Sequence, residues 1–391
     1  MELWLVEIAK AFMRFLANPL LYWFLIIALL ASTSRIKYER RQFGQKIFPI
    51  LDEVYGYRRK SMVFGLILSL LLLLLGVVLE PLMLIGLVIV TILLSISRRF
   101  TWLSTAYTFG ITAIILLFLP LYESWLPTFL QVEISTLSWV SFTVIMGLFL
   151  IFEAFISGRI IQDQTFPELF KSPRGKTIGQ HRFKKIMIIP TLMIWPIGGL
   201  ELNIDWWPVL EWQGEQFGLI IFPFIIGIEH VFKSALPQKM MKRMSHYLLL
   251  LGLVVVAISL VGYFVEIAVI MGVAVALIGR EWITYRFRRQ DSQGEPFFNP
   301  INNGIKVLAV LPESPAVDMG LGVGDRITKV NGLAVSGVND FYQALQENRA
   351  FCKLDVLDER GEVRFVQRAL YQNEHHELGV IFSVSHDERV G

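Results

Sequence analysis

The sequence predicts an α-helical polytopic membrane domain that is followed by a small α+β domain at the C-terminus. Of its 391 residues, 54% are hydrophobic and only 18% are charged, whereas soluble domains are about one quarter charged. The long apolar runs lie almost entirely within residues 1–280, and residues 281–391 have the composition of an ordinary globular domain. This change in composition divides the chain into a membrane part and a globular part.

Nine apolar segments in residues 19–280 are candidates for membrane spans, because roughly 20 apolar residues cross a bilayer as a helix. They lie near residues 19–34, 61–79, 82–97, 102–120, 137–157, 185–200, 217–232, 246–264 and 266–280. Several are short, and three prolines interrupt them: Pro190, Pro196 and Pro223. Kinked or partial spans would reduce the total, so we expect eight or nine helices.

Residues 1–18 predict an amphipathic segment and not a cleavable signal peptide. The charged residues Glu7, Lys10 and Arg14 interrupt its apolar stretch, and no small-residue cleavage site follows. Its apolar side chains recur at helical spacing, at Leu5, Ile8, Phe12 and Phe15. We therefore expect a short helix that lies in the membrane interface.

Basic residues alternate between the connecting segments, which predicts the orientation of the chain in the membrane. Segments 34–60, 98–99, 158–185 and 233–243 carry eight, two, seven and four Lys and Arg residues, twenty-one together. The intervening loops near 80, 121–136, 201–216 and 265 carry none and are acidic. Because Lys and Arg favour the cytoplasmic side, the C-terminal domain is predicted to be cytoplasmic.

The globular part begins after a polar segment, residues 281–303, that predicts a cytoplasmic linker. Alternating apolar residues and turn signals predict strands at 304–310, 326–330, 353–357, 363–368 and 378–382, and helices after Pro315 and over 338–348. Asn331-Gly332 is a strong turn signal. The small domain is thus expected to span residues 304–383, with residues 384–391 as a C-terminal tail.

The run PESPAVDMGLGVGDRITKVNG, residues 312–332, closely resembles the sequence pattern of PDZ domains. The order of elements resembles the permuted bacterial form of that domain, in which the strand that bears the carboxylate-binding loop comes last. Here that strand is expected at residues 377–382, which resemble the family's hydrophobic-Gly-hydrophobic loop. The resemblance covers about 80 residues and implies a peptide-binding groove.

In such a groove an extended peptide adds as a strand to an open sheet edge. The predicted peptide-binding residues are Leu378, Gly379, Val380, Ile381, Phe382, Phe341, Tyr342 and Leu345. Side chains alternate along a strand, so some of these residues must belong to the core. His375 and His376 stand where many relatives have Gly or a basic residue, which leaves three ligands open: a C-terminal carboxylate, an internal segment, or a docked protein surface.

No catalytic constellation is recognisable, and we expect a protein that is not an enzyme and has no cofactor and no metal. An intramembrane metalloprotease needs His-Glu-x-x-His on a helix, and neither Glu229-His230 nor the run at 374–377 has that spacing. Gly320-x-Gly322-x-Gly324 lacks the lysine of a nucleotide-binding loop. The single Cys352 excludes a disulfide framework, and a formal charge of +3 gives no reason to expect nucleic-acid binding.

Glu153 and Glu229 are the ionisable residues that would suggest transport. Both lie near the predicted cytoplasmic border, where snorkelling of the side chain to water accounts for them.

The whole chain resembles the MinJ family of Gram-positive bacteria. The first loop carries the pattern Arg-Ile-Lys-x-Glu-Arg-x-x-Phe at residues 35–43, with many spans and a terminal PDZ domain after it. The resemblance implies a determinant of division-site placement that sits at septa and poles and bridges DivIVA to MinD, the membrane-bound ATPase that restrains FtsZ. The residues agree with a scaffold, and leave two alternatives: a PDZ-bearing regulator of a membrane protease or sensor, and a transporter.

Overall fold

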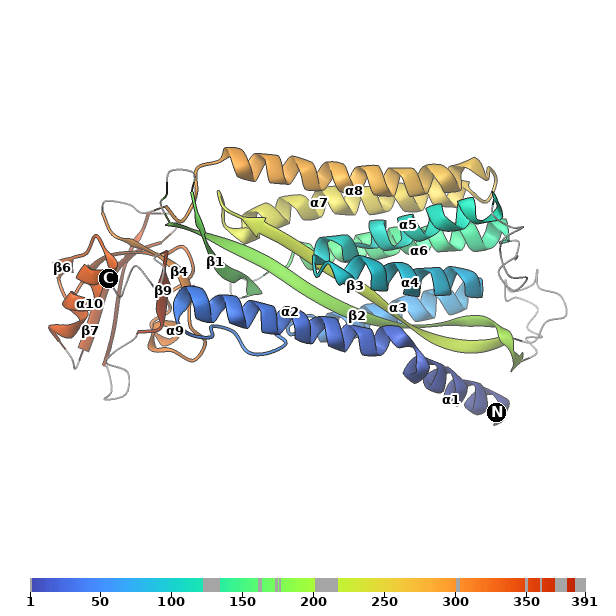
Figure 1. Ribbon diagram of the computed structural model, residues 1–391, viewed down its shortest axis with the longest axis horizontal. Coiled ribbons are helices and arrows are strands. Elements are labelled where there is room, and N and C mark those ends of the chain that lie inside the picture. Colours follow the sequence, from blue (N-terminus) through green and yellow to red (C-terminus); the bar gives the residue numbers. More distant parts are fainter. Residues whose placement is uncertain are drawn as a thin grey trace.

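The computed structural model describes residues 2–121, 134–160, 164–172, 175, 177–200, 217–299, 303–348, 351–358, 361–369 and 378–383. The molecule is elongated, with its helices aligned along the long axis and a small C-terminal domain at one end (Figure 1). The N-terminal helix lies at the opposite end. The predicted fold class is confirmed: a part rich in apolar helices precedes a small domain of strands and short helices.

Eight helices of more than ten residues make up most of the described membrane part. They are α1 (Glu2–Ala17), α2 (Pro19–Phe43), α3 (Arg58–Leu74), α4 (Pro81–Ile96), α5 (Thr105–Phe118), α6 (Thr136–Ser157), α7 (Pro237–Val261) and α8 (Ile267–Gln293). Four of these, α2, α6, α7 and α8, are long and apolar enough to cross a membrane. Large apolar side chains such as Leu250 and Ile278 are 61% and 70% exposed, as expected for surfaces that contact lipid.

Two of the predicted helical spans are wrong, because residues 185–200 and 217–232 form β-strands. They belong to a three-stranded antiparallel sheet of β1 (Phe166–Lys171), β2 (Thr177–Leu200) and β3 (Phe217–Phe232), with β2 in the middle. An apolar run without polar alternation fits a buried strand as well as a helix. The isoleucine-rich composition and the prolines of these two segments were the signals for strands. However, β2 has 24 residues and β3 has 16, and both are longer than a usual strand.

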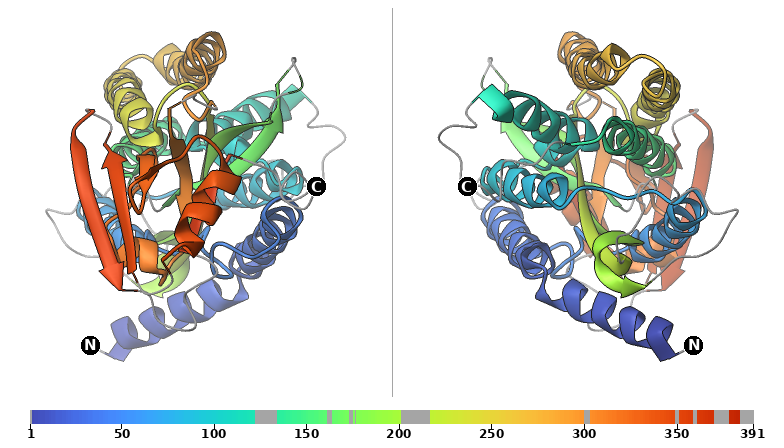
Figure 2. Two further views of the ribbon diagram at one scale, coloured as in Figure 1. Left: turned by 90° about the vertical axis from the view of Figure 1, so that its left-hand side faces the viewer. Right: turned by 90° about the vertical axis from the view of Figure 1, so that its right-hand side faces the viewer.

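The β2–β3 hairpin lies inside the bundle with helices on both sides of it (Figure 2). Nearly every described residue of β3 is buried. Strands at membrane depth are tolerated only where protein covers their backbone, and this arrangement provides that cover. Because β2 and β3 are antiparallel, they replace two antiparallel helical spans without changing the predicted alternation of basic and acidic connecting segments.

The outer edge of β2 is satisfied by groups from the preceding helices. The Leu192 N–H donates to Ser69 Oγ at 2.8 Å, and the Ile186 N–H donates to the Glu53 carbonyl at 3.0 Å. Pro190 has no N–H to satisfy. Helix α3 approaches there so closely that a Cβ on Gly65 would lie 2.4 Å from the Pro190 carbonyl oxygen.

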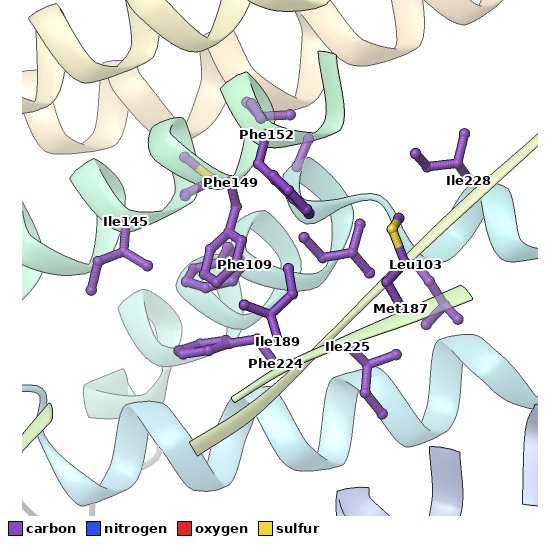
Figure 3. Packing of buried hydrophobic residues seen from close by; sticks show 14 of the residues in the cluster. Leu103, Phe109, Ile145, Phe149, Phe152, Met187, Ile189, Phe224, Ile225 and Ile228 are labelled. Atoms are coloured by element: carbon purple, nitrogen blue, oxygen red, sulfur yellow. The ribbon is translucent and has the colours of Figure 1, made fainter. Parts of the chain in front are cut away.

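The main core forms where α5 and α6 pack on the hairpin (Figure 3). The rings of Phe109, Phe149 and Phe224 make a mutual aromatic cluster, with centroids 4.8 to 5.9 Å apart. Each ring comes from a different element, so this cluster joins both helices to β3. Burial of such rings contributes more than any other side-chain type to a core.

Helix α8 continues through residues 281–293, which the sequence analysis assigned to a linker. Arg280 therefore lies within a helix, and its side chain is fully buried. Its guanidinium donates to Glu153 Oε1 at 2.8 Å and to Ser104 Oγ at 2.8 Å. Snorkelling is thus the wrong account of Glu153, which is also fully buried and ion-paired.

Glu229 is likewise held by hydrogen bonds inside the protein, and its side chain does not extend to water at the membrane surface. It accepts hydrogen bonds from the Arg182 guanidinium at 2.5 Å and from the Phe100 N–H at 2.7 Å. Phe100 begins the short 3-10 helix η1 (Phe100–Leu103), so Glu229 fixes this turn against β3.

Helix α1 confirms the helix predicted near the N-terminus. Leu5, Ile8 and Phe12 are 67%, 51% and 53% exposed, while Arg14 donates to the Leu219 carbonyl of β3 at 2.6 Å. One side of the helix therefore packs on the hairpin, and its apolar side is open. Its position in the membrane interface stays a prediction.

The small domain has a sheet in the order β8-β7-β5-β4-β9, with β6 paired to β5. Its elements are β4 (Ile305–Val310), α9 (Pro315–Asp318), β5 (Arg326–Val330), β6 (Leu333–Ala334), α10 (Val338–Gln346), β7 (Phe351–Leu357), β8 (Val363–Ala369) and β9 (Val380–Phe382). The turn predicted at Asn331-Gly332 is confirmed, with φ of +50° and +90°. All predicted strands and both predicted helices of this part are present.

Removal of one partner of the Glu153–Arg280 pair should destabilise the membrane part by about 3–5 kcal/mol, because it leaves an uncompensated charge in the interior. We expect Glu153→Gln and Arg280→Gln each to lower the midpoint of thermal unfolding in detergent. The double variant Glu153→Leu/Arg280→Met should recover part of the loss. Arg289→Gln, on the exposed side of the same helix, is the control, and single variants as stable as this control would contradict the prediction.

Candidate functional site: the end strand of the small domain and its docking surface

The predicted peptide-binding strand β9 lies at the end of the sheet of the small domain. It pairs with β4 through Val380 and Phe382, and no described strand pairs with its other side. Helix α10 packs next to it, since the rings of Phe341 and Phe382 lie 5.0 Å apart. The structure therefore brings together the strand and the helix that the sequence analysis assigned to a groove.

Most of the predicted groove side chains are part of the domain core. Leu378, Val380, Phe382, Phe341 and Leu345 are all less than 9% exposed and belong to one cluster. Tyr342 packs against this cluster and keeps part of its surface exposed. Tyr342 is therefore the only predicted groove side chain among these six described residues that is not buried.

Gly379 occupies a position that requires glycine. Its φ is +78°, and a Cβ at this residue would lie 2.2 Å from Ser314 Cβ. The carbonyls of Leu378 and Gly379 accept hydrogen bonds from α9 and from the segment before it: the Leu311 N–H donates to the Gly379 oxygen at 2.8 Å, and the Ala316 N–H to the Leu378 oxygen at 3.0 Å. The glycine thus fixes the start of β9. His375 and His376 lie outside the described residues.

Ile381 faces away from the core of the small domain and belongs to a different cluster. It is 2% exposed and packs with residues of β4 and of the membrane part. We call this cluster the docking core; its buried members are Phe43, Ile47, Phe48, Phe166, Leu169, Leu236, Phe298, Leu308, Ala309, Val323 and Ile381. The small domain is therefore packed onto the membrane part through an apolar contact.

The docking core contains one buried polar link, at His181 of β2. Its Nε2 lies 2.8 Å from the Leu308 carbonyl of β4, and its Nδ1 lies 2.9 Å from Thr165 Oγ1. The Leu308 oxygen can only accept, so Nε2 carries the proton and Nδ1 accepts from the threonine hydroxyl. Complete burial lowers the pKa of His181 to about 4, and the ring is neutral at physiological pH.

The first loop supplies the other half of the docking surface through a set of ion pairs. Arg35 contacts Glu39 at 2.6 Å and Glu53 at 2.8 Å, and it stacks on the ring of Phe166. Glu39 also accepts from the Ile47 N–H at 2.8 Å. Arg35, Glu39 and Phe43 are three of the six fixed positions of the first-loop pattern; Arg35 and Glu39 order this loop, and Phe43 packs in the docking core.

Sequence reasoning missed the docking core, since its members come from seven separate parts of the chain. Two weak signals existed. The first-loop pattern marked Arg35, Glu39 and Phe43, and His181 stood at the beginning of an apolar run. Within the described ranges no three His, Cys, Asp or Glu side chains group as metal ligands would.

Comparison with known proteins identifies the family. The model of the PDZ domain matches residues 306–356. Over 381 residues, 97% of this chain and 96% of the relative, the sequence is 34% identical to the cell division topological determinant MinJ of Bacillus subtilis. The chain belongs to the MinJ family.

Two other matches are confined to a small part of the chain. The probable MinJ of Lacticaseibacillus paracasei is 34% identical over 80 residues, which are 20% of this chain and 22% of that protein. Among solved structures, the PDZ domain of an SdrC-like protein from Listeria monocytogenes aligns with 22% of this chain and 92% of its own, at 18% identity and a TM-score of 0.19. The similarity to Bacillus subtilis MinJ is the one that extends over both parts of the molecule.

Docking of the small domain should weaken in acid because of His181. Its pKa is about 4 in the folded chain and about 6.5 when exposed, so the open state binds more protons between these values. The free energy that neutral His181 contributes to docking is at its maximum above about pH 6.5. It falls by about 1.4 kcal/mol per pH unit as the pH drops toward 4. Hydrogen exchange at the amides of β4 and β9 would measure this opening.

A matched pair of variants separates His181 from other acid effects. His181→Gln keeps a donor for the Leu308 carbonyl but does not titrate, so its exchange should depend less on pH. His246→Gln, an exposed histidine of α7, should retain the wild-type slope. If hydrogen exchange depends on pH equally in the wild type and both variants, His181 is not the group that controls docking.

Proposed function

We propose that this member of the MinJ family is a multi-pass scaffold of the bacterial cell membrane, with its PDZ domain on the cytoplasmic side. The observation that carries the proposal is the 34% identity to a cell division topological determinant over both the membrane part and the PDZ domain. The proposed role is to recruit division regulators, with DivIVA and MinD as partners, at septa and poles.

The charge pattern supports this orientation. The basic segments 34–60, 158–185 and 233–243 lead into the end of the bundle that carries the PDZ domain (Figure 1). Lys and Arg are retained on the cytoplasmic side of membranes. The four helices long enough to span and the exposed apolar surfaces of α7 and α8 support a membrane position.

The docked PDZ domain supports a role as a scaffold. A domain on a flexible linker samples many positions, whereas the docking core holds this one at the end of the bundle. The proposed groove lies beside β9, on the side where no described strand pairs, and it is thereby held in a fixed orientation relative to the membrane part. The proposed ligand adds as a strand beside β9, with Leu378, Gly379, Val380, Ile381 and Phe382 as the binding strand and Phe341, Tyr342 and Leu345 as the facing helix.

No described side chains form a catalytic arrangement with a recognisable nucleophile and base, and the ionisable residues Glu153, Glu229 and Arg280 are held in ion pairs. These pairs give the buried charges a structural role and weaken the case for transport. The remaining alternative is a regulator of a membrane protease or sensor. Affinity capture of such a protein from cross-linked cells, without any division protein, would favour it.

Tyr342→Ala should weaken binding of a division partner about tenfold, because an exposed aromatic side chain at an interface is a frequent centre of binding energy. The measurement is affinity of the full-length protein in nanodiscs for purified DivIVA and MinD. Phe365→Ala is the matched control, since this ring is 69% exposed on β8 at the other end of the sheet. Equal affinities of the two variants would show that the groove does not bind these partners.

Localisation tests the role in the cell. A fluorescent fusion should concentrate at septa, and a deletion strain should misplace them. A uniform membrane signal through division, together with normal septa in the deletion strain, would overturn the proposed function.

A further inference from the structure

A cavity of about 570 Å³ opens at the PDZ end of the bundle, where β2, β3, α7 and α8 meet. It is separate from the groove beside β9, and no role in the proposed scaffold accounts for it. Four basic side chains line it: Arg99, Arg182, Lys233 and Arg288. Two acidic side chains, Glu229 and Asp291, also line it, so the lining carries more positive than negative charge.

Both carboxylates in the lining are already engaged. Glu229 accepts from Arg182 and from the Phe100 N–H. Asp291 accepts from the N–H groups of Lys233 and Ser234, each at 3.0 Å or less, and from the Ser234 hydroxyl at 2.9 Å. Arg99 and Arg288, in contrast, make no ion pair with any described residue, and both are exposed to solvent. The cavity thus presents two uncompensated guanidinium groups.

Two buried polar atoms in the lining lack hydrogen-bond partners within the described structure. They are His230 Nε2 and Gln180 Oε1, and their residues are 7% and 8% exposed. Buried polar groups are nearly always satisfied in folded proteins. Both atoms are themselves inaccessible, so they lie behind the wall of the cavity, and the guanidinium groups of Arg99 and Arg288 remain the polar groups available to a ligand.

One wall of the cavity is apolar and lies near the expected membrane surface. Met240, Met244 and Phe287 form this wall. On α8, Trp282 and Tyr285 are 49% and 58% exposed about one turn before it, and such aromatic residues mark the membrane interface. On the proposed topology, the cavity therefore lies at the level of the headgroups of the inner leaflet.

We propose that this cavity binds the phosphate of an anionic phospholipid. The guanidinium groups of Arg99 and Arg288 bind the phosphate oxygens, since arginine matches phosphate geometry with two parallel hydrogen bonds. The acyl chains lie along the apolar wall of Met240, Met244 and Phe287. Basic pockets between helices at the inner surface are a known kind of headgroup site.

The test uses the full-length protein in a neutral detergent, where binding does not depend on topology or on any division partner. Short-chain phosphatidylglycerol should raise the midpoint of thermal unfolding in a saturable way, and short-chain phosphatidylcholine should not. Inorganic phosphate is the third arm: protection by phosphate alone at similar concentrations would overturn the lipid assignment and identify a free phosphate site.

Variants assign the effect to the cavity. Arg99→Gln/Arg288→Gln should raise the half-saturating concentration of phosphatidylglycerol at least about tenfold, because it removes both uncompensated charges. Arg289→Gln, the neighbour of Arg288 that does not line the cavity, should bind as the wild type does. Equal protection of the double variant and Arg289→Gln, or equal protection by phosphatidylcholine, would overturn the proposal, and a failure of partner binding through the PDZ groove would leave it unaffected.

Discussion

The need to satisfy the backbone of the β2–β3 hairpin organises the rest of the molecule. A strand in a nonpolar interior carries N–H and C=O groups on its outer edge, and each one left unpaired costs several kcal/mol. Along the outer edge of β2, backbone N–H groups donate hydrogen bonds to the Ser69 hydroxyl and to the Glu53 carbonyl. Along β3 the Leu219 carbonyl accepts from Arg14, and the Glu229 carbonyl from Thr101. Helix α1, the loop before α3, α3 itself and η1 are thereby held against the hairpin.

The same hairpin connects the membrane part to the PDZ domain. At its inner end, His181 of β2 donates to Leu308 in β4, and Gly179 forms a bridge with Phe298. β4 lies beside β9 in the sheet, so the strand that carries the docking contact is adjacent to the proposed peptide-binding strand. A force or conformational change in either part would reach the other through two neighbouring strands.

Local sequence signals were sufficient for the PDZ domain but not for the membrane part. The turn at Asn331-Gly332 and the glycine at 379 were predictable because each has a conformational reason that depends on only a few neighbours. The helical prediction for residues 185–200 and 217–232 failed because hydrophobicity reports burial and not the hydrogen-bonding pattern. The partial exposure of Tyr342, in contrast to buried Phe341, could not be predicted, since both are aromatic residues that the sequence assigned to the same groove.

The sequence by itself determined the membrane class, the PDZ domain and the MinJ family, and its basic segments predicted the sidedness. These properties depend on composition and on short motifs, which act over a few residues. Only the tertiary structure decided that Arg280 pairs with Glu153 and that Ile381 packs on the membrane part. It also decided that Arg99 and Arg288 meet around one cavity. Such contacts join residues more than one hundred positions apart, and their energies arise from burial and charge pairing that no local pattern encodes.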